Sequence, residues 1–204
     1  MKIPATAQHI DRDTAVSMAS RRQLGLLDWI VLLFYPAARK PQQILDAPLV
    51  YYPFWFVGAE LSFSRPGTQP RIEYQFVVVD GFFLNANRVI GAPDAETREV
   101  EASRVVCSRG GGEQATAAAV EYLNKTSSLR YKKVPEIKPL EVRHLYKPYF
   151  LVECDRGGKR YHIAYDAESG MRNYYLDVKA RELRFEAEAA AESQTETENQ
   201  EQQQ

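Results

Sequence analysis

The sequence predicts an α+β fold of two tandem units, each a helix packed on a three-stranded antiparallel sheet, followed by a C-terminal helix and a disordered tail. The first observation is a repeat: the aromatic stretch Val50–Val57 (VYYPFWFV) returns as Leu145–Val152 (LYKPYFLV). Each copy leads into a β-rich run and then an Asp-led turn, so one design is used twice. The second observation is that 45% of the 204 residues are hydrophobic, which is enough for packed cores.

The repeat sets the expected boundaries. We expect the first unit at residues 1–98, the second at residues 99–178, and a charged helix with a tail at residues 179–204. Residues 193–204 are rich in Gln, Glu and Thr and contain nothing that could bury a core, so they predict disorder.

The first unit is expected to begin with a helix near Thr14, because Asp11 or Asp13 can cap its first turn. Three strands follow, at residues 49–63, 72–79 and 82–90. The first strand is apolar on both alternating faces, which predicts that it is covered on both sides. Asp80-Gly81 lies between two apolar runs and predicts a two-residue type I′ turn.

The second unit opens with three glycines, residues 110–112, and an alanine-rich helix at residues 113–124. The Gly-Lys-Ser/Thr signature of a phosphate-binding loop does not follow, so the glycines predict a flexible joint. A basic link and three strands complete the unit, at residues 125–138, 140–154, 160–165 and 171–178, and the charged helix follows at residues 179–191.

A Gly157-Gly158 turn fixes the expected register of the second hairpin. It places three apolar pairs on one face, which we expect to be the core: Cys154 with Tyr161, Val152 with Ile163, and Phe150 with Tyr165. On the other face the same register places Glu153 opposite His162 and predicts a structural ion pair between them.

An apolar segment, residues 24–38, lies between two pairs of basic residues. A transmembrane helix needs about 20 predominantly apolar residues, so the segment is short for that role. Three interpretations remain: a helix buried inside the protein, an interfacial helix with Trp29 and Tyr35 at the boundary, or a segment that binds a partner. Met1–His9 lacks the apolar core of a secretory signal, which favours a cytoplasmic location.

Residues 161–170 (YHIAYDAESG) carry a resemblance to a known family. A strand that runs into Asp166-Ala167 and a glycine, Gly170, resembles the end of the PepSY domain, with Ser169 where Thr is usual. In the first unit only Asp80-Gly81 matches, in a turn that looks shortened. The resemblance implies a cystatin-like α+β module that binds or restrains other proteins and has no catalytic centre.

Motifs for chemistry are missing from the sequence. The three histidines, His9, His144 and His162, form no metal-binding pattern, and no serine-nucleophile motif is present. We therefore expect no catalytic residues, no metal and no cofactor. Cys107 and Cys154 fit reduced structural cysteines, with a disulfide or a reactive thiol as alternatives.

The expected partner is another protein or a second copy of the chain. A net charge of −1 gives no general attraction to nucleic acid, and tyrosines among the lysines of residues 131–149 suit strand packing as well as base stacking. The aromatic surplus instead predicts a protein-binding surface, with five candidate residues: Trp29, Tyr52, Phe54, Phe56 and Tyr149. The alternative is a peripheral membrane-associated factor anchored by residues 24–38.

Overall fold

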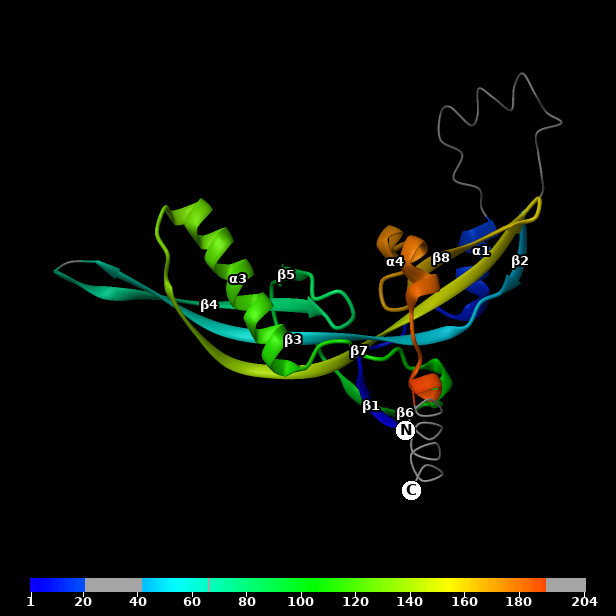
Figure 1. Cartoon of the computed structure of the whole chain (residues 1–204), viewed down its shortest axis with the longest axis horizontal. Helices are drawn as coiled ribbons and strands as arrows, with labels where there is room; N and C mark the ends of the chain where they lie inside the picture. The colour runs from blue at the N-terminus through cyan, green and yellow to red at the C-terminus, as the bar shows by residue number, and fades with distance from the viewer. Residues whose placement is uncertain (21–41, 66, 190–204) are drawn as a thin grey trace, which may run out of the picture. The chain divides into compact units, whose positions relative to one another are not determined.

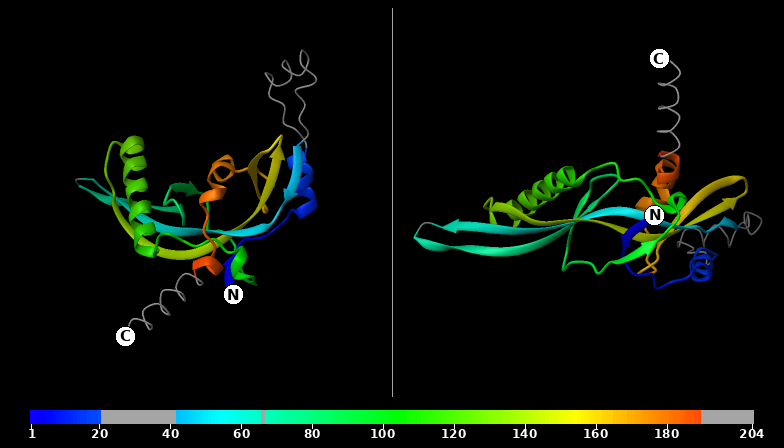
Figure 2. Two further views of the ribbon diagram at one scale, coloured as in Figure 1. Left: turned by 45° about the vertical axis from the view of Figure 1, so that its right-hand side comes forward. Right: turned by 90° about the horizontal axis from the view of Figure 1, so that it is seen from below.

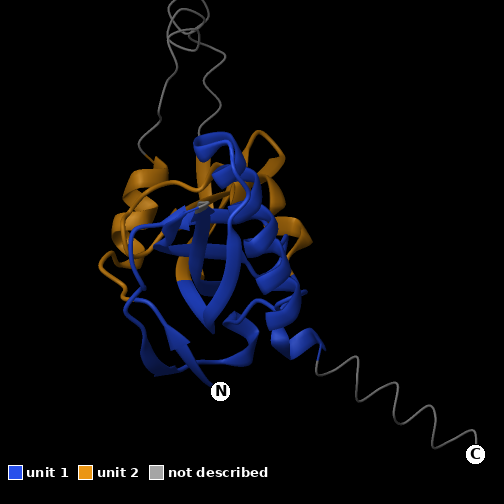
Figure 3. Ribbon diagram, turned by 90° about the vertical axis from the view of Figure 1, so that its left-hand side faces the viewer, with its two compact units in different colours: residues 1–6, 51–147, 184–204 blue, residues 7–50, 148–183 orange. Residues whose placement is uncertain are grey.

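A computed structural model describes residues 1–20, 42–65 and 67–189. Two predictions lie outside these residues: the apolar segment 24–38, with Trp29, and the tail 193–204. The chain divides into two compact units (Figure 3). Unit 1 consists of residues 1–6, 51–147 and 184–204, and unit 2 consists of residues 7–50 and 148–183.

Eight strands form one mixed sheet, in the order β5-β4-β3-β7-β1-β6, with β2 and β8 also paired to β7 (Figure 1). The strands are β1 (Lys2–Ala5), β2 (Gln42–Asp46), β3 (Leu49–Arg65), β4 (Thr68–Asp80), β5 (Ala86–Val89), β6 (Glu96–Glu99), β7 (Glu136–Arg156) and β8 (Lys159–Asp166). The helices are α1 (Arg12–Ser20), α3 (Gly112–Tyr131) and α4 (Tyr174–Lys179), with 3₁₀ turns η2 (Ala102–Arg104) and η3 (Ala180–Glu182).

The prediction of two tandem units, each a helix on its own three-stranded sheet, is therefore wrong. The physical reason is the length of β3 and β7, which have 17 and 21 residues. Each strand is long enough to change neighbours along its course: β7 meets β1 at Tyr146 and then pairs with β8 from Tyr149 to Arg156. The sheet continues through the point at which the sequence predicted a boundary.

Unit 1 has its core between α3 and the β3–β4 hairpin, and Figure 2 shows the helix lying over one face of that hairpin. Odd-numbered residues of β3 face the helix, as period-two alternation requires. This core consists of buried apolar residues: Val57, Ala59, Leu61, Phe63, Val77, Val79, Ala115, Ala119 and Leu123. Even-numbered residues of β3 face the other way, and Phe54 and Phe56 are buried there in a second cluster with Leu145 of β7.

Helix α3 is longer than the sequence predicted. The basic link expected from residue 125 begins instead after Tyr131, because Thr126 turns its hydroxyl back to the carbonyl of Tyr122 at 2.8 Å and Ser127 is buried in the interface. The helix ends at Lys132, which adopts a left-handed conformation and donates its N–H to the carbonyl of Ser128. Polar residues that read as a link are therefore part of the packed helix.

Unit 2 has its core between α1 and the β7–β8 hairpin. Asp11 caps α1, because its carboxylate accepts the N–H of Thr14 at 2.8 Å. Hydrogen bonds from the side chain of Thr14 and from its backbone lower the pKa of Asp11. The predicted register of the hairpin is confirmed, with Cys154, Val152 and Phe150 opposite their expected partners. All three of these side chains lie in the core cluster with Ala15 and Ala19 of α1.

The last predicted strand, residues 171–178, is a helix instead. Only Arg172 makes a strand-like bridge, to Tyr165. Asn173 then caps α4 by accepting the N–H of Leu176 at 3.1 Å. The carboxylate of Asp177 accepts the N–H of Ala164 at 2.6 Å, so a side chain satisfies a group that a further strand would have paired.

The turn at Asp80 is not the predicted two-residue turn. β4 and β5 do form a hairpin, but Val79 pairs with Ala86, so a longer loop joins them. The carboxylate of Asp80 accepts the N–H groups of Phe82 and Phe83 at 2.9 and 2.7 Å. Gly81 is needed for space, since a Cβ there would lie 2.9 Å from the carbonyl oxygen of Pro53.

Candidate protein-binding groove

The candidate site in unit 1 begins at an unpaired length of strand. β5 pairs with β4 only from Phe76 to Val79. From Gln69 to Gln75, β4 has β3 on one side, and no described strand pairs with it on the other. A strand edge of this kind presents backbone donors and acceptors to any chain that approaches it.

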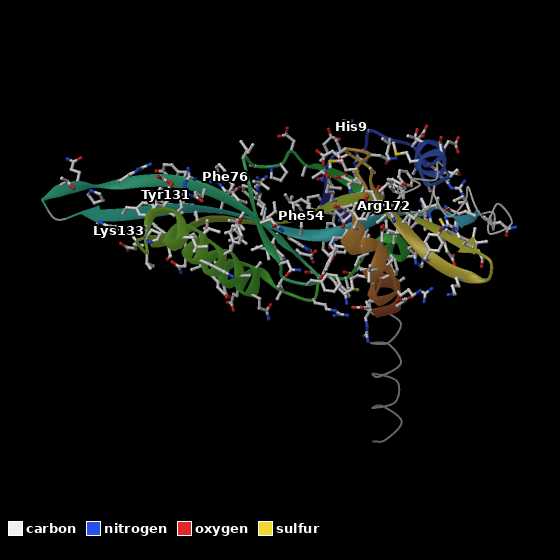
Figure 4. The ribbon with its side chains drawn as sticks, turned by 90° about the horizontal axis from the view of Figure 1, so that it is seen from above. His9, Phe54, Phe76, Tyr131, Lys133 and Arg172 are labelled. Atoms are coloured by element: carbon white, nitrogen blue, oxygen red, sulfur yellow. The ribbon has the colours of Figure 1, made fainter. Side chains whose placement is uncertain are left out.

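A groove lies beside this edge, between β4, the end of β5 and the last turns of α3. Figure 4 labels Phe76 on the strand and Tyr131 and Lys133 at the end of the helix. Seven residues line the groove, most of them polar: Gln75, Arg88, Tyr122, Thr126, Ser127, Arg130 and Tyr131. Polar groups on rigid elements are therefore gathered where the strand edge is open.

Hydrogen bonds hold the tyrosines of the groove in place. The hydroxyl of Tyr122 accepts the backbone N–H of Arg88 at 3.3 Å. The hydroxyl of Tyr131 donates to Glu73 Oε2 at 3.1 Å, and Glu73 also forms an ion pair with Arg71 at 2.6 Å. The wall of the groove is thus fixed by contacts that join α3 to both strands of the β4–β5 hairpin.

The charge of the groove is positive. Arg88 and Arg130 are exposed, and among the residues described here neither forms an ion pair with a carboxylate. Arg130 lies 5.3 Å above the ring of Tyr131, a cation–π contact that leaves its charge unbalanced. Glu73, which accepts the hydroxyl of Tyr131, is already neutralised by Arg71. The groove therefore favours a negatively charged ligand.

An apolar hollow continues from the groove along the strand edge. It shares Gln75 and Arg88 with the groove and is otherwise lined by Tyr74, Phe76, Val89 and Ile90. Ile90 is fully exposed, and the side chains of Ile72 and Tyr74 are 53% and 62% exposed. Apolar side chains that stay this exposed beside an open strand edge are typical of a surface that binds another chain.

Four of the five candidate residues from the sequence are described by the structure, and they lie outside the groove. Tyr52, Phe54 and Phe56 are buried within unit 1, and the hydroxyl of Tyr52 donates to Asp80 at 2.9 Å. Tyr149 is half-buried in unit 2, where its hydroxyl accepts the amide of Asn173 at 3.5 Å. Trp29 lies outside the described residues. Their role in binding a partner stays a prediction.

The groove was missed in the sequence because its residues are far apart in the chain. Arg88 and Arg130 carry no motif, and each looks like an ordinary surface charge. The exposure of Ile90, which follows Val89 and precedes Gly91, is visible only in the folded chain.

His144 and His162 are partly buried, whereas His9 is exposed. His144 stacks on Trp55 with 4.4 Å between ring centroids, and burial lowers its pKa. Burial also lowers the pKa of His162 below its ordinary value. The charge of Glu153, opposite His162 in the β7–β8 ladder, offsets part of this shift. Glu153 forms an ion pair with Arg160 at 3.6 Å, so the expected pairing with His162 is replaced by one with a permanent cation.

Both cysteines are free thiols: Cys107 is half-buried and Cys154 is buried. Burial raises the pKa of each thiol, which opposes formation of the reactive thiolate. Within residues 1–20, 42–65 and 67–189, no group of three or more His, Cys, Asp or Glu side chains could hold a metal ion. No helix in these ranges is long and apolar enough to cross a membrane.

Comparisons with known proteins give no relative. No family model matches the chain, and neither a curated protein nor a solved structure is significantly similar to it. The resemblance of residues 161–170 to the PepSY domain therefore stays a prediction. The groove of unit 1 is the feature from which a function can be inferred.

Proposed function

We propose that this protein is a non-catalytic protein-binding module and that the groove of unit 1 is its binding site. The observation that carries the proposal is the open edge of β4, flanked by exposed Ile72, Tyr74 and Ile90 and by two arginines that form no ion pair within the part of the chain that the structure describes. Open edges favour association with other chains, and folded proteins usually protect them with charges, proline or covering elements.

The chemistry of the groove supports binding over catalysis. Its side chains are arginine, tyrosine, glutamine, serine and threonine, and the groove is shallow and open. It contains no histidine, cysteine or carboxylate that could act as nucleophile or general base on a bound substrate. Arginine and tyrosine are the residue types enriched in protein interfaces. A cytoplasmic location is part of the proposal, and the two free thiols fit it.

Site-specific crosslinking in the native host tests the proposal. A photoreactive phenylalanine derivative replaces Tyr74 at the groove or, as the matched control, Tyr174 in unit 2; the two side chains are 62% and 64% exposed. We expect illumination to join a partner protein to position 74 and not to position 174. Purified partner and module should then form a complex in size-exclusion light scattering.

A charge-reversal variant completes this test. Arg88→Glu with Arg130→Glu in the Tyr74 probe protein should abolish the adduct, whereas Arg104→Glu, at an exposed ion pair with Glu101 outside the groove, should leave it unchanged. Equal adducts at positions 74 and 174, or an adduct that survives the double reversal, would contradict the proposal.

A further inference from the structure

The same strand edge occurs in both units, and unit 2 covers a longer stretch of it with its own chain than unit 1 does. Counting back from the turn aspartates Asp80 and Asp166, Val78 of β4 corresponds to Ala164 of β8, and Tyr74 corresponds to Arg160. In unit 2 the carbonyl of Ala164 accepts the N–H of Asn173 at 2.8 Å, and its N–H donates to Asp177. Arg181 donates to the carbonyl of Arg160. Helix α4 and turn η3 thus seal the edge of β8.

In unit 1 the described residues cover only part of this edge. β5 occupies the edge of β4 as far as Phe76 and then leaves at Ile90. From Gln75 back to Gln69, no described strand pairs with this edge of β4. Pro70 lies near the far end, and proline on an edge strand discourages pairing at that point. The open and pairable part is therefore Arg71–Gln75.

The two faces beside this edge differ in chemistry. Arg88 pairs with Val77 in the ladder and so projects to the α3 side, where Arg130 also lies. Tyr74 and Ile72 project to the opposite side, because side chains alternate along a strand. A strand added at the edge would therefore present every second side chain to the arginines and the intervening ones to Ile72 and Tyr74.

We propose that Arg71–Gln75 of β4 accepts an extended segment of a partner protein as an added antiparallel strand, with acidic and apolar residues alternating along it. This inference rests on the proposed function and specifies its partner. Main-chain hydrogen bonds give such a complex its affinity, and alternate side chains give its specificity. Acidic residues on the α3 side balance Arg88 and Arg130, and apolar residues on the other side cover Ile72 and Tyr74.

A second copy of the chain fits this edge poorly. Antiparallel pairing of two β4 edges would bring Arg88 and Arg130 of both molecules to one seam. Like charges placed together across an interface disfavour the association. The occupant is therefore a different chain that carries the opposite charge.

The test uses the full-length protein and a defined probe, a fluorescein-labelled heptapeptide of alternating Glu and Val. We expect fluorescence anisotropy to show saturable binding that weakens with salt. The double variant Arg88→Glu with Arg130→Glu should weaken it by at least about tenfold, while Arg104→Glu leaves it unchanged. The same heptapeptide with Lys in place of Glu should bind at least about tenfold more weakly.

Hydrogen exchange tests whether the peptide binds as a strand. Amide exchange at residues 71–75 should slow when the Glu/Val heptapeptide is bound, and a central proline in the peptide should abolish both the binding and this protection. Unchanged exchange at residues 71–75, equal binding by the double variant, or a dimer joined through this edge in light scattering would each overturn the proposal.

The two proposals fail in distinguishable ways. A site-specific adduct at position 74 together with no protection at residues 71–75 would leave a binding module that does not use strand addition. Loss of the adduct as well would remove the proposed function itself.

Discussion

Two turns, one in each unit, follow the same hydrogen-bond path with almost no sequence in common. Residues 80–85 read DGFFLN and residues 166–171 read DAESGM. In unit 1, Asp80 N–H donates to the carbonyl of Asn85 at 2.8 Å and Leu84 N–H donates to that of Asp80 at 2.9 Å. In unit 2 the corresponding bonds, Asp166 to Met171 and Gly170 to Asp166, are 2.9 and 2.8 Å. The shared aspartate sets the path.

The surroundings of the two turns also correspond. Residue 81 donates its N–H to the carbonyl of Pro53 at 3.0 Å, and residue 167 donates to that of Pro148 at 2.9 Å. The residue three positions before each unit's main helix completes the match: Arg109 donates to the carbonyl of Gly81 at 2.9 Å, and His9 donates to that of Ala167 at 2.8 Å. The turn in unit 1 is therefore not shortened, although its sequence suggested that it was.

The largest expected effect comes from removing the shared aspartate from each unit. Each carboxylate accepts two backbone N–H groups and one hydroxyl, from Tyr52 in unit 1 and from Ser169 in unit 2. We expect Asp80→Ala and Asp166→Ala each to lower the free energy of unfolding by about 3 kcal/mol, because hydrogen bonds to a charged group are strong. Urea denaturation measures both losses.

Tyr52→Phe and Ser169→Ala serve as milder controls, since each removes one donor and leaves the backbone bonds. Each should cost about 1 kcal/mol. A loss below 1 kcal/mol for either aspartate variant would show that the turn is held by its neighbours rather than by the carboxylate.

The sequence predicted what depends on neighbouring residues and missed what depends on distant ones. The Gly157-Gly158 turn fixed the register of β7 and β8, because both glycines adopt positive φ and the strands on either side alternate cleanly. The Asp80-Gly81 turn was mistaken for the same type. Its geometry comes from Pro53 and Arg109, which the local sequence does not reveal.

The fold class failed for a similar reason. The repeat of aromatic stretches was visible, but the sequence does not show which helix packs on which hairpin. The order of elements in the chain predicts that each helix packs on the strands that follow it. Helix α3 instead packs on β3 and β4, which precede it. The candidate groove inherits this difficulty, because Arg88 and Arg130 meet only when α3 packs in that way.

The second prediction concerns an apolar side chain that the turn contributes in unit 1 and the segment before the helix contributes in unit 2. Leu84 has a positive φ of 58°, where unit 2 has Gly170 with 72°. A Cβ on Gly110 would lie 2.5 Å from Leu84 Cδ2, whereas a Cβ on Gly170 would lie 3.7 Å from Ile10 Cγ2. In unit 1 the turn therefore supplies the leucine and the helix start supplies the glycine. In unit 2 these contributions are reversed.

A double-mutant cycle tests this exchange. Gly110→Ile alone should destabilise unit 1 by about 2 kcal/mol, because its side chain would overlap Leu84. Leu84→Gly alone should cost about 1 kcal/mol, since the lost packing is partly offset by relief of the left-handed strain. The double variant reproduces the unit 2 pair and should cost less than the two changes summed, by about 1–2 kcal/mol. Additive losses in urea denaturation would contradict the exchange.

The third prediction concerns the point at which the two units diverge after the turn. Asn87 continues into β5, whereas the corresponding Asn173 caps α4. Asn173→Ala should cost about 1 kcal/mol because the cap is lost, while the exposed Asn87→Ala should change stability by less than about 0.5 kcal/mol. Amide exchange at Ala164 should also accelerate in Asn173→Ala, since Asp177 would no longer be held over the edge of β8. Equal effects of the two changes would show that the cap does not distinguish the units.

The smallest expected effect is a pH dependence in unit 1. Burial lowers the pKa of His144 below its ordinary 6.5, so the unfolded chain takes up this proton at a higher pH than the folded chain. Stability from this group is therefore complete above pH 6.5 and is lost as the pH falls from 6.5 through the folded pKa.

His144→Phe keeps a ring on Trp55 and removes the titration. The stability difference between wild type and this variant, measured by urea denaturation at pH 7.5 and pH 5.5, should shift in favour of the variant at the lower pH. A constant difference would mean that His144 is protonated equally in both states. The stacked rings of His144 and Trp55 would then be accessible to water in the folded protein.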